Sequence, residues 1–498
     1  MKKKFRYLVA IGVVALLMWG WQFVPQAAAS NQTQAIHTIS RLSYGATPKQ
    51  IAKVQKAGIE SYIQAQLNPD SISETALLNN KLKKLPSAIA NDSVATWRKY
   101  RQYDRRINAK GENTPTTEAR KRLEKERNQL RNQLVREAKQ AHIARAVFSS
   151  RQLQEVMTDF WFNHFNVYAS KRAVGIWVND YESQLRKHSL GNFRDLLGVT
   201  AHHPAMLMYL DNDLNTNPNS KSKQGNARGL NENYARELME LHTLGVDGGY
   251  TQQDVIALAR IFTGWGINYN PEPQDTSAFR FFERRHDNGE KTFLGQKIPG
   301  NGIAEGEKAL DILASHSSTA RFVSYKLAQY FVSDRPPESL VNVLAQTFTA
   351  SDGNIKTVLD TLFHSTEFND PQYYQAKFKT PLQYVVSLVR ASNIRDFKLE
   401  RLENILSSLG MPVYSCVTPD GYKNTETAWL NPDTMLRRLS FAVNIANGGL
   451  NKSQKPSWQQ LQQTLGSKLT NKTKKAIAPQ PNHLKSALIL GSPEMMYR

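Results

Sequence analysis

Residues 231–245 combine an acid and an imidazole with a run of leucines, in the sequence NENYARELMELHTLG. Projected as a helix, this segment places Glu237 between Leu241 and Leu244, and it places His242 at the other edge of the same apolar face. An ionised carboxylate near a hydrophobic core is costly unless it is paired or bound to a metal. We therefore expect Glu237 to meet a polar partner from elsewhere in the chain and to form a site for acid/base chemistry or metal binding.

The histidines that can supply this partner lie in three other motifs. His164 lies on the apolar stripe of RQLQEVMTDFWFNHFN. His202 and His203 are adjacent in TAHHPAMLMYLDN, and His286 precedes Asp287 at a turn. Imidazole nitrogens and carboxylate oxygens are good ligands for zinc, iron or manganese. The expected ligands of such a divalent metal are Glu237, His242, His164, His286 and Asp287.

Structural pairing also explains these residues. Glu237 can pair with Arg41 or Arg260, and the histidines can bond to backbone carbonyls, without any catalysis. The chain has no HExxH, CxxC, GxSxG or P-loop motif that would decide between the two interpretations. Both interpretations stay open.

The elements that must position these residues are mostly helices. Apolar residues recur at helical spacing through most of the chain, and a helical hairpin rich in basic residues is expected at about 92–149. The turn-forming Asp287-Asn288-Gly289 predicts one small β-hairpin near 278–295. The fold class predicted is mainly α: a large, irregular multi-helix domain, with a polar connector at 211–229.

The first 29 residues have the basic head, apolar middle and small-residue end of a secretory signal. We therefore expect an exported protein, in the periplasm or at the cell surface, with a single domain at 30–498. An uncleaved signal that anchors the chain in the membrane is the alternative, because Tyr7 to Val24 is almost long enough to span a bilayer. Cys416 is the single cysteine, so the fold must be held together by packing without internal disulfides.

The net charge of the chain indicates which classes of partner it favours. The chain has 64 Lys and Arg against 43 Asp and Glu, a formal net charge of +21, which attracts polyanions. No nucleic-acid-binding signature accompanies this charge. Outside the cytoplasm, an acidic envelope polymer or polysaccharide is the expected partner.

Several motifs resemble those of the DUF1800 family of exported bacterial proteins. They include ISRLSYGATP, DFWFNHFNV, HPAMLMYLDN, NENYARELMELHTLGVDGGYTQQDV, HDNGEKTFLG and the closing LGSPEMMYR, and together they span nearly all of the chain after the signal. The resemblance implies a helical fold and an envelope location but no reaction. It also implies a possible partner, a co-exported DUF1501-type protein related to sulfatase-like hydrolases. The chain departs from the family pattern at Ser317 and in the extended basic hairpin.

Carried over by motif, the resemblance implies a set of site residues: Asp159, His164, His203, Glu237, His242, His286 and Asp287. Two functions remain. One is an extracytoplasmic enzyme, a hydrolase or oxidoreductase acting on an envelope polymer, whose catalytic residues are Glu237, His242, His164, Asp159 and His203. The other is a non-catalytic basic scaffold that binds an acidic surface polymer or a secreted partner protein.

Overall fold

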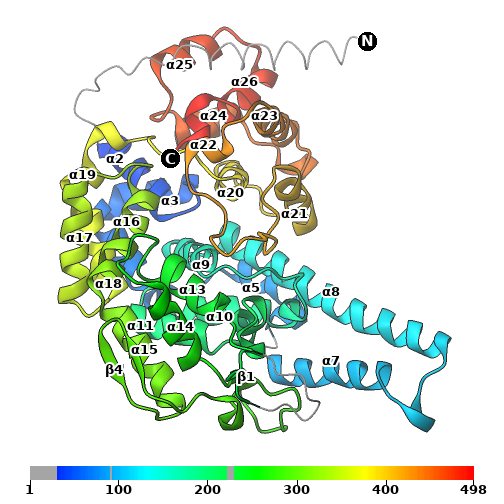
Figure 1. The fold of residues 1–498 in the computed structure, drawn as a ribbon. Coiled ribbons are helices and arrows are strands. Elements are labelled where there is room, and N and C mark those ends of the chain that lie inside the picture. The colour runs from blue at the N-terminus through cyan, green and yellow to red at the C-terminus, as the bar shows by residue number, and fades with distance from the viewer. Residues whose placement is uncertain (1–30, 90–91, 221–228) are drawn as a thin grey trace.

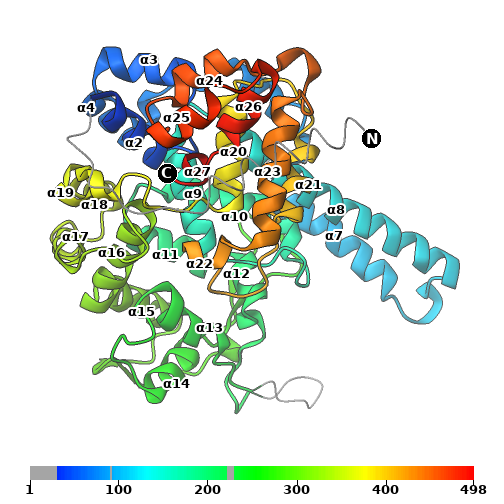
Figure 2. The same cartoon turned by 90° about the horizontal axis from the view of Figure 1, so that it is seen from above.

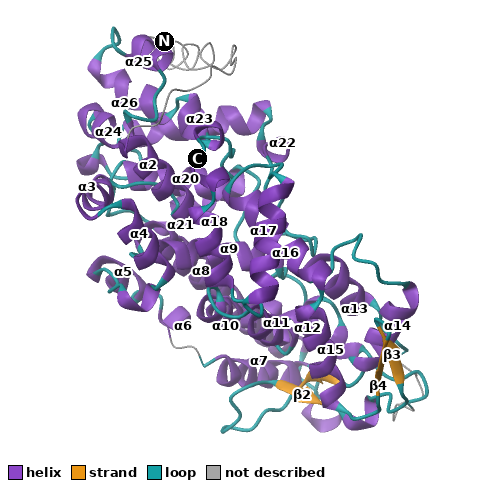
Figure 3. Ribbon diagram, turned by 90° about the vertical axis from the view of Figure 1, so that its left-hand side faces the viewer, coloured by secondary structure: helices purple, strands orange, loops and turns teal. Residues whose placement is uncertain are grey.

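Helices dominate the architecture, as the sequence predicts (Figure 3). The computed structural model describes residues 31–89, 92–220 and 229–498. The predicted signal at 1–29 lies outside the described residues. Within them, the strands form two small two-stranded sheets, so the predicted mainly α fold is confirmed.

The N-terminal helices show that local capping signals were informative. Thr47 caps the helix at Pro48 by accepting a hydrogen bond from the Gln50 backbone N–H. These helices are α2 (Asn31–Leu42), α3 (Pro48–Ala57), α4 (Ile59–Leu67), α5 (Ala76–Leu82) and α6 (Pro86–Ile89).

A helical hairpin projects from the body of the protein (Figures 1 and 2). It consists of α7 (Ser93–Ile107) and α8 (Thr117–Phe148), which pack against each other. The C-terminal part of α8 enters the body, where it contacts α10 and α21. One helix thus joins an exposed arm to the core.

A central group of helices surrounds α10, which packs against α7, α8, α9, α11 and α12. Pro204 begins a new helix after α11, since its ring fits the first turn of a helix, and His203 caps that helix. The helices of this group are α9 (Gln152–His164), α10 (Val174–His188), α11 (Phe193–Ala201) and α12 (Pro204–Tyr209).

The segment that carries Glu237 is not a regular α-helix. It begins as α13 (Asn233–Glu237) and continues as the π-helix η4 (Leu238–His242). Gly245 then ends the helix with a positive φ of 84°, and its N–H bonds to the Met239 carbonyl. π-Helical turns are uncommon and often lie at functional sites.

Two of the four strands, β2 and β3, lie within the range predicted for the hairpin, 278–295, but they pair with other strands and not with each other. β1 (Trp265–Ile267) pairs with β2 (Phe279–Phe281), and β3 (Lys291–Phe293) pairs with β4 (Gln296–Ile298), both antiparallel. The β3–β4 hairpin turns at Leu294 and Gly295, which both have positive φ, and this geometry matches the right-handed twist of the strands. The Asp287-Asn288-Gly289 turn therefore joins two different sheets.

The first part of the predicted polar connector 211–229 is packed by polar contacts. Asn212, Asp213 and Asn215 are buried, and Asp213 pairs with Arg172 at 2.6 Å. Residues 221–228 lie outside the described part of the chain.

The remaining helices complete the body around this centre (Figure 1). One helix, α14 (Gln252–Ile261), precedes the strands. The helices that follow them are α15 (Ile303–Ser315), α16 (Ser317–Phe331), α17 (Glu338–Ala350), α18 (Ile355–His364) and α19 (Thr366–Asn369). The C-terminal group contains α20 (Pro381–Ala391), α21 (Leu399–Ser408), α22 (Glu426–Trp429), α23 (Pro432–Ala446), α24 (Trp458–Leu465), α25 (Asn471–Ile477), α26 (Asn482–Leu490) and α27 (Pro493–Met496). Short 3₁₀ turns lie between them: η1 (Pro69–Ser71), η2 (Gly111–Asn113), η3 (Asn212–Leu214), η5 (Glu283–Arg285), η6 (Pro371–Tyr373) and η7 (Lys452–Gln454).

Among the described helices, none combines the length and the apolar character needed to cross a membrane.

Candidate functional site

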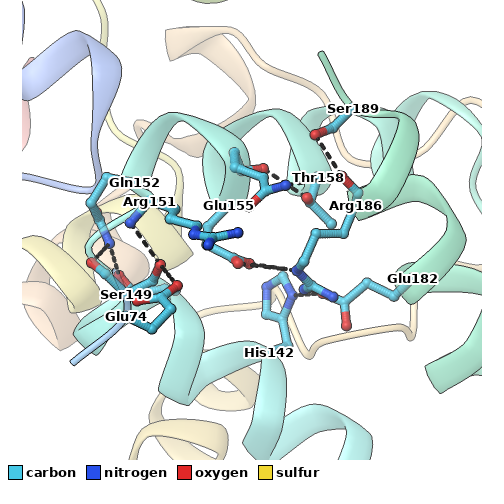
Figure 4. Close-up of polar contacts among 12 residues, drawn as sticks. Glu74, His142, Ser149, Arg151, Gln152, Glu155, Thr158, Glu182, Arg186 and Ser189 are labelled. Carbon is cyan, nitrogen blue, oxygen red and sulfur yellow. Dashed lines mark hydrogen bonds and ion pairs between the residues drawn. The ribbon is translucent and has the colours of Figure 1, made fainter. Parts of the chain in front are cut away.

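A network of buried charges joins α8, α9 and α10 (Figure 4). His142 of α8 donates from Nδ1 to Glu182 Oε1 at 2.7 Å, and Arg186 contacts the same oxygen at 2.9 Å. Arg186 also pairs with Glu155 of α9 at 3.0 Å, while the Tyr414 hydroxyl donates to the second oxygen of Glu182 at 2.9 Å. His142, Glu155, Glu182 and Arg186 thus each have a charged partner, as burial requires.

Asp159, one of the residues implied by the resemblance, lies at the edge of this network. Its Oδ1 is 3.7 Å from His142 Nε2, and 19% of its side chain is exposed. Burial raises the pKa of Asp159 to about 6, although the charge of His142 opposes this shift. A carboxyl group that titrates near neutral pH can both accept and donate a proton under physiological conditions.

The pKa values of Asp159 and Glu182, the two acids beside His142, are shifted in opposite directions. Burial opposes ionisation, but Arg186 and His142 hold the pKa of Glu182 well below its ordinary value. Burial also opposes a charged imidazole, yet Glu182 and Asp159 raise the pKa of His142 above its ordinary value. Neighbouring titratable groups whose environments push their pKa values apart are typical of acid/base sites.

Asp159 and His142 line a cavity of about 30 Å³. The segment 411–424 also lines this cavity, through residues that include Tyr414, Cys416 and Tyr422. The cavity is large enough for a group the size of a water molecule. It therefore brings a small reacting group to the acid and the imidazole together. We call the side chains of Asp159, His142 and Glu182, with this cavity, the α8–α10 site.

The sequence did not identify His142 and Glu182. The sequence predicts a basic helical hairpin at about 92–149, and this pattern gives His142 no functional role. The last residues of α8, AHIARAVF, are apolar apart from His142 and Arg145, which is the signal that the histidine is buried and needs a partner. Glu182 and Arg186 at i and i+4 predict only an ordinary helix pair. The approach of two helices could not be derived from either segment.

His164 and His242 lie close together, and the bond between them involves the backbone of His242. His164 donates from Nε2 to the His242 carbonyl at 3.0 Å, and the ring centroids are 6.0 Å apart. Burial and the nearby Lys326 lower the pKa of His164 well below its ordinary value and that of His242 to about 3, so both rings are neutral. His164 Nδ1 and His242 Nε2 are buried and have no hydrogen-bond partner within the described chain.

Glu237, the residue that began the prediction, is half-buried. Its carboxylate makes no hydrogen bond or ion pair with the described residues, so neither Arg41 nor Arg260 is its partner. Burial, followed by the charges of Glu240 and Asp420, raises its pKa above the ordinary value. The predicted proximity to the core is observed, and the predicted partner is not.

His203 lines a second, larger cavity of about 390 Å³. Its Nδ1 accepts the Ala205 backbone N–H at 3.1 Å, so its Nε2 donates to Asp180 at 3.2 Å. Ser93 donates to the same Asp180 oxygen at 3.1 Å. Both nitrogens of His203 are engaged, which is the arrangement of a helix cap that also orients a carboxylate.

His286 and Asp287 belong to a third cluster near the strands. His286 Nε2 contacts Glu305 at 2.9 Å, and its Nδ1 contacts the Thr263 carbonyl at 2.8 Å. Asp287 pairs with Arg260 at 2.8 Å. Both imidazole nitrogens therefore face oxygen atoms of the protein, as the structural interpretation of the histidines expected.

The five predicted metal ligands are thus divided among three places in the fold. In residues 31–89, 92–220 and 229–498, no group of three or more His, Cys, Asp or Glu side chains is placed to share a metal ion. The catalytic and ligand roles of these residues stay predictions, while the expected convergence of Glu237, His242, His164, His286 and Asp287 is not observed.

The helical core and its buried charges define a mainly α-helical protein with an internal His/carboxylate site. The chain belongs to the DUF1800 family, because the family model described as "Protein of unknown function (DUF1800)" matches residues 37–497. This match covers nearly the whole chain and confirms the resemblance of its motifs. Comparisons with curated proteins and with solved structures found no match.

Proposed function

We propose that the protein is an exported hydrolase that cleaves an envelope polymer by acid/base catalysis at the α8–α10 site. One observation carries the proposal: Asp159, whose pKa is about 6, lies 3.7 Å from the imidazole of His142 at the wall of a cavity. Perturbed carboxyl groups of this kind are concentrated at active sites.

The proposed reaction uses the two side chains in different roles. The Asp159 carboxylate takes a proton from a water molecule as that water attacks the scissile bond. His142 gives the proton on Nε2 to the leaving atom, so the bond breaks as one proton is taken and another is given. The proton on Asp159 then passes to His142, which restores both groups. Glu182 keeps His142 oriented and charged through its bond to Nδ1.

The polymer and the location follow from the sequence. The secretory signal at 1–29 supports export to the periplasm or cell surface, and the net charge of +21 favours an acidic envelope polymer or polysaccharide. A co-exported DUF1501-type protein is the partner that the family resemblance suggests. Attachment to a membrane is proposed only through an uncleaved signal, and no role with nucleic acid is proposed.

The test is the release of reducing ends from envelope polysaccharides by the chain without its signal. We expect the wild-type rate to rise with pH through about 6, as Asp159 ionises, and to fall at higher pH as His142 loses its proton. Asp159→Asn should lower the rate by about 100-fold or more, the usual contribution of a general acid or base.

A comparison variant distinguishes the two cavities. Asp180→Asn removes the carboxylate of the larger cavity that His203 contacts, and it changes no residue of the α8–α10 site. Full activity in Asp159→Asn, together with loss in Asp180→Asn, would place the chemistry in the larger cavity and contradict the proposal. Absence of product from the wild-type chain on every envelope polysaccharide would contradict it as well.

A further inference from the structure

The projecting hairpin carries a large share of the positive charge of the protein. Residues 93–148 contain 15 Lys and Arg against six Asp and Glu. Among the exposed side chains of the hairpin, basic residues outnumber acidic ones by a larger ratio. The exposed basic residues are Lys99, Arg105, Arg106, Lys110, Arg120, Lys121, Arg122, Lys125 and Arg136, and the exposed acidic residues are Glu112 and Glu118. This charge lies on an arm that extends from the body (Figures 1 and 2).

The exposed cations of α8 form a stripe that also contains amides. Lys121, Lys125, Asn128, Asn132 and Arg136 follow one another at spacings of three and four, and all are exposed. At 1.5 Å per residue, the stripe is about 22 Å long. We call these five residues the α8 stripe.

The apolar side of α8 faces the opposite way. Leu123 is buried, and Leu130 and Leu134 pack against the core cluster. These leucines lie about 180° around the helix from the α8 stripe. The stripe therefore cannot turn into the hairpin interior, and α7 presents a similar outer row at Lys99, Gln102 and Arg105.

Ion pairing inside the hairpin leaves the stripe cations free to bind. Arg101 and Arg127 pair with Asp104, and Arg122 pairs with Glu126. Lys121, Lys125 and Arg136 have no hydrogen bond or ion pair with the described residues. Their charges are therefore directed to solvent.

We propose that the α8 stripe binds an acidic polysaccharide. The cations pair with its carboxylate or sulfate groups, and the asparagines between them bond to its sugar hydroxyls. A lipid surface fits less well, because none of the exposed large hydrophobic side chains in the described chain lies on the hairpin to anchor it in a bilayer. This inference rests on the proposed function for the view that the substrate is a polymer, and it names the chemistry of that polymer.

The experiment measures binding of fluorescent polygalacturonate oligomers by anisotropy at about 0.15 M salt, where the Debye length is about 8 Å and distant charges are screened. The variant Lys121→Gln/Lys125→Gln/Arg136→Gln removes three stripe charges. We expect its affinity to fall by about tenfold, the sum of three surface charge contacts. Neutral dextran should not bind to either protein.

A matched control removes the same number of charges from another exposed helix. Lys472→Gln/Lys474→Gln/Lys475→Gln changes α25, which lies away from the hairpin (Figure 1) and carries these lysines exposed. Its affinity should change by less than about twofold, because screening removes the effect of distant charges. Equal losses in both triple variants would show a general charge effect and overturn the inference.

Two further measurements separate this inference from other outcomes. Binding to phosphatidylglycerol vesicles that exceeds binding to the polysaccharide, and that depends on the same three cations, would assign the stripe to a membrane and overturn the inference. Asp159→Asn should bind the oligomers as the wild type does. Hairpin-dependent binding without any cleavage would leave the stripe assignment standing and contradict the proposed hydrolase.

Discussion

The raised pKa of Asp159 predicts that its ionised carboxyl group destabilises the folded state. Its folded-state pKa of about 6 lies above the ordinary value of 3.8. A raised pKa means that the group contributes its full stability below pH 3.8 and that this stability is lost as the pH rises through 6. At pH 7.5 the ionised carboxyl therefore destabilises the fold by up to about 3 kcal/mol, from two pKa units at 1.36 kcal/mol each.

Asp159→Asn should therefore raise the melting temperature at pH 7.5 while it removes activity. At pH 4 the two proteins should melt at similar temperatures, because Asp159 is then neutral in the folded state. Thermal melts at both pH values check this, and a lower melting temperature for the variant at both would show that the carboxyl is a structural partner of His142.

The pH dependence of stability that His242 contributes has the opposite sign, because the folded-state pKa of His242 is lowered to about 3 from 6.5. The unfolded chain binds a proton between these values and the folded chain does not, so stability falls as the pH falls from 6.5 towards 3. His242→Leu removes this difference and also the buried ring nitrogen that lacks a partner. We expect the loss of melting temperature between pH 7.5 and pH 5 to be smaller in the variant.

The comparison for this variant is His364→Leu, because His364 is partly exposed and bonded to Glu60. Contact with Glu60 raises the pKa of His364, so its contribution is lost as the pH rises. An equal pH dependence in the wild type and His242→Leu would mean that the buried imidazole does not control acid stability.

At the scale of elements, the sequence predicted what local chemistry determines. Thr47 and Asn431 cap helices that begin with proline, and Gly245 ends the helix that carries Glu237. The π-helical turn at Leu238–His242 was not predicted, because it inserts one extra residue into a pattern that otherwise has the period of an α-helix. This insertion changes the directions of Glu237 and His242 relative to a regular helical projection.

Gly306 shows how packing between elements reverses a local preference. Alanine is favoured over glycine within a helix by about 1 kcal/mol. In α15, however, a Cβ at Gly306 would lie 2.1 Å from the buried Trp265 ring. Gly306→Ala should therefore lower the stability by about 1–3 kcal/mol, as overpacked cores do.

Gly198→Ala in α11 is the matched control for this prediction. A Cβ there meets only the terminal nitrogen of Arg194, which can rotate away. Denaturant melts should show a gain of up to about 1 kcal/mol for this variant. A gain in Gly306→Ala as well would mean that Trp265 moves easily and that the contact does not constrain α15.

At the scale of the whole molecule, the fold class was predictable and the site was not. Composition and helical spacing indicate a mainly α protein, and they place His142 and Asp159 on helices, but they did not predict the helix α10 that carries Glu182. The distances among these residues depend on how α8, α9 and α10 pack, and periodicity along each helix does not encode that packing. The helical spacing of the neighbouring leucines predicted that Glu237 lies near the core, but a partner from a distant part of the chain was not found for it among the described residues.

The size of the cavity sets a condition on the proposed function. At about 30 Å³ it can admit a small group but not a polymer chain, so the segment 411–424 must move to expose Asp159. Several hydrogen bonds hold this segment in place. Asn166 donates to the Cys416 carbonyl at 3.1 Å and to the Thr418 carbonyl at 2.8 Å. Asn163 bonds to the Tyr422 backbone, and the Tyr209 hydroxyl donates to the Val417 carbonyl at 2.7 Å. Breaking these bonds locally costs less free energy than unfolding the whole protein, so we expect the segment to open as a unit.

Cys416 reports this motion, because it is the single cysteine, it is buried, and it lines the cavity. We expect a small thiol reagent to label it faster than the protein unfolds, with a weak dependence on denaturant that indicates local opening. Asn166→Ala should accelerate labelling, whereas Asn447→Ala, which changes an exposed residue of another helix end, should not. Labelling that is no faster than global unfolding, with the full denaturant dependence, would leave a polymer without access to Asp159 and would contradict the proposed hydrolase.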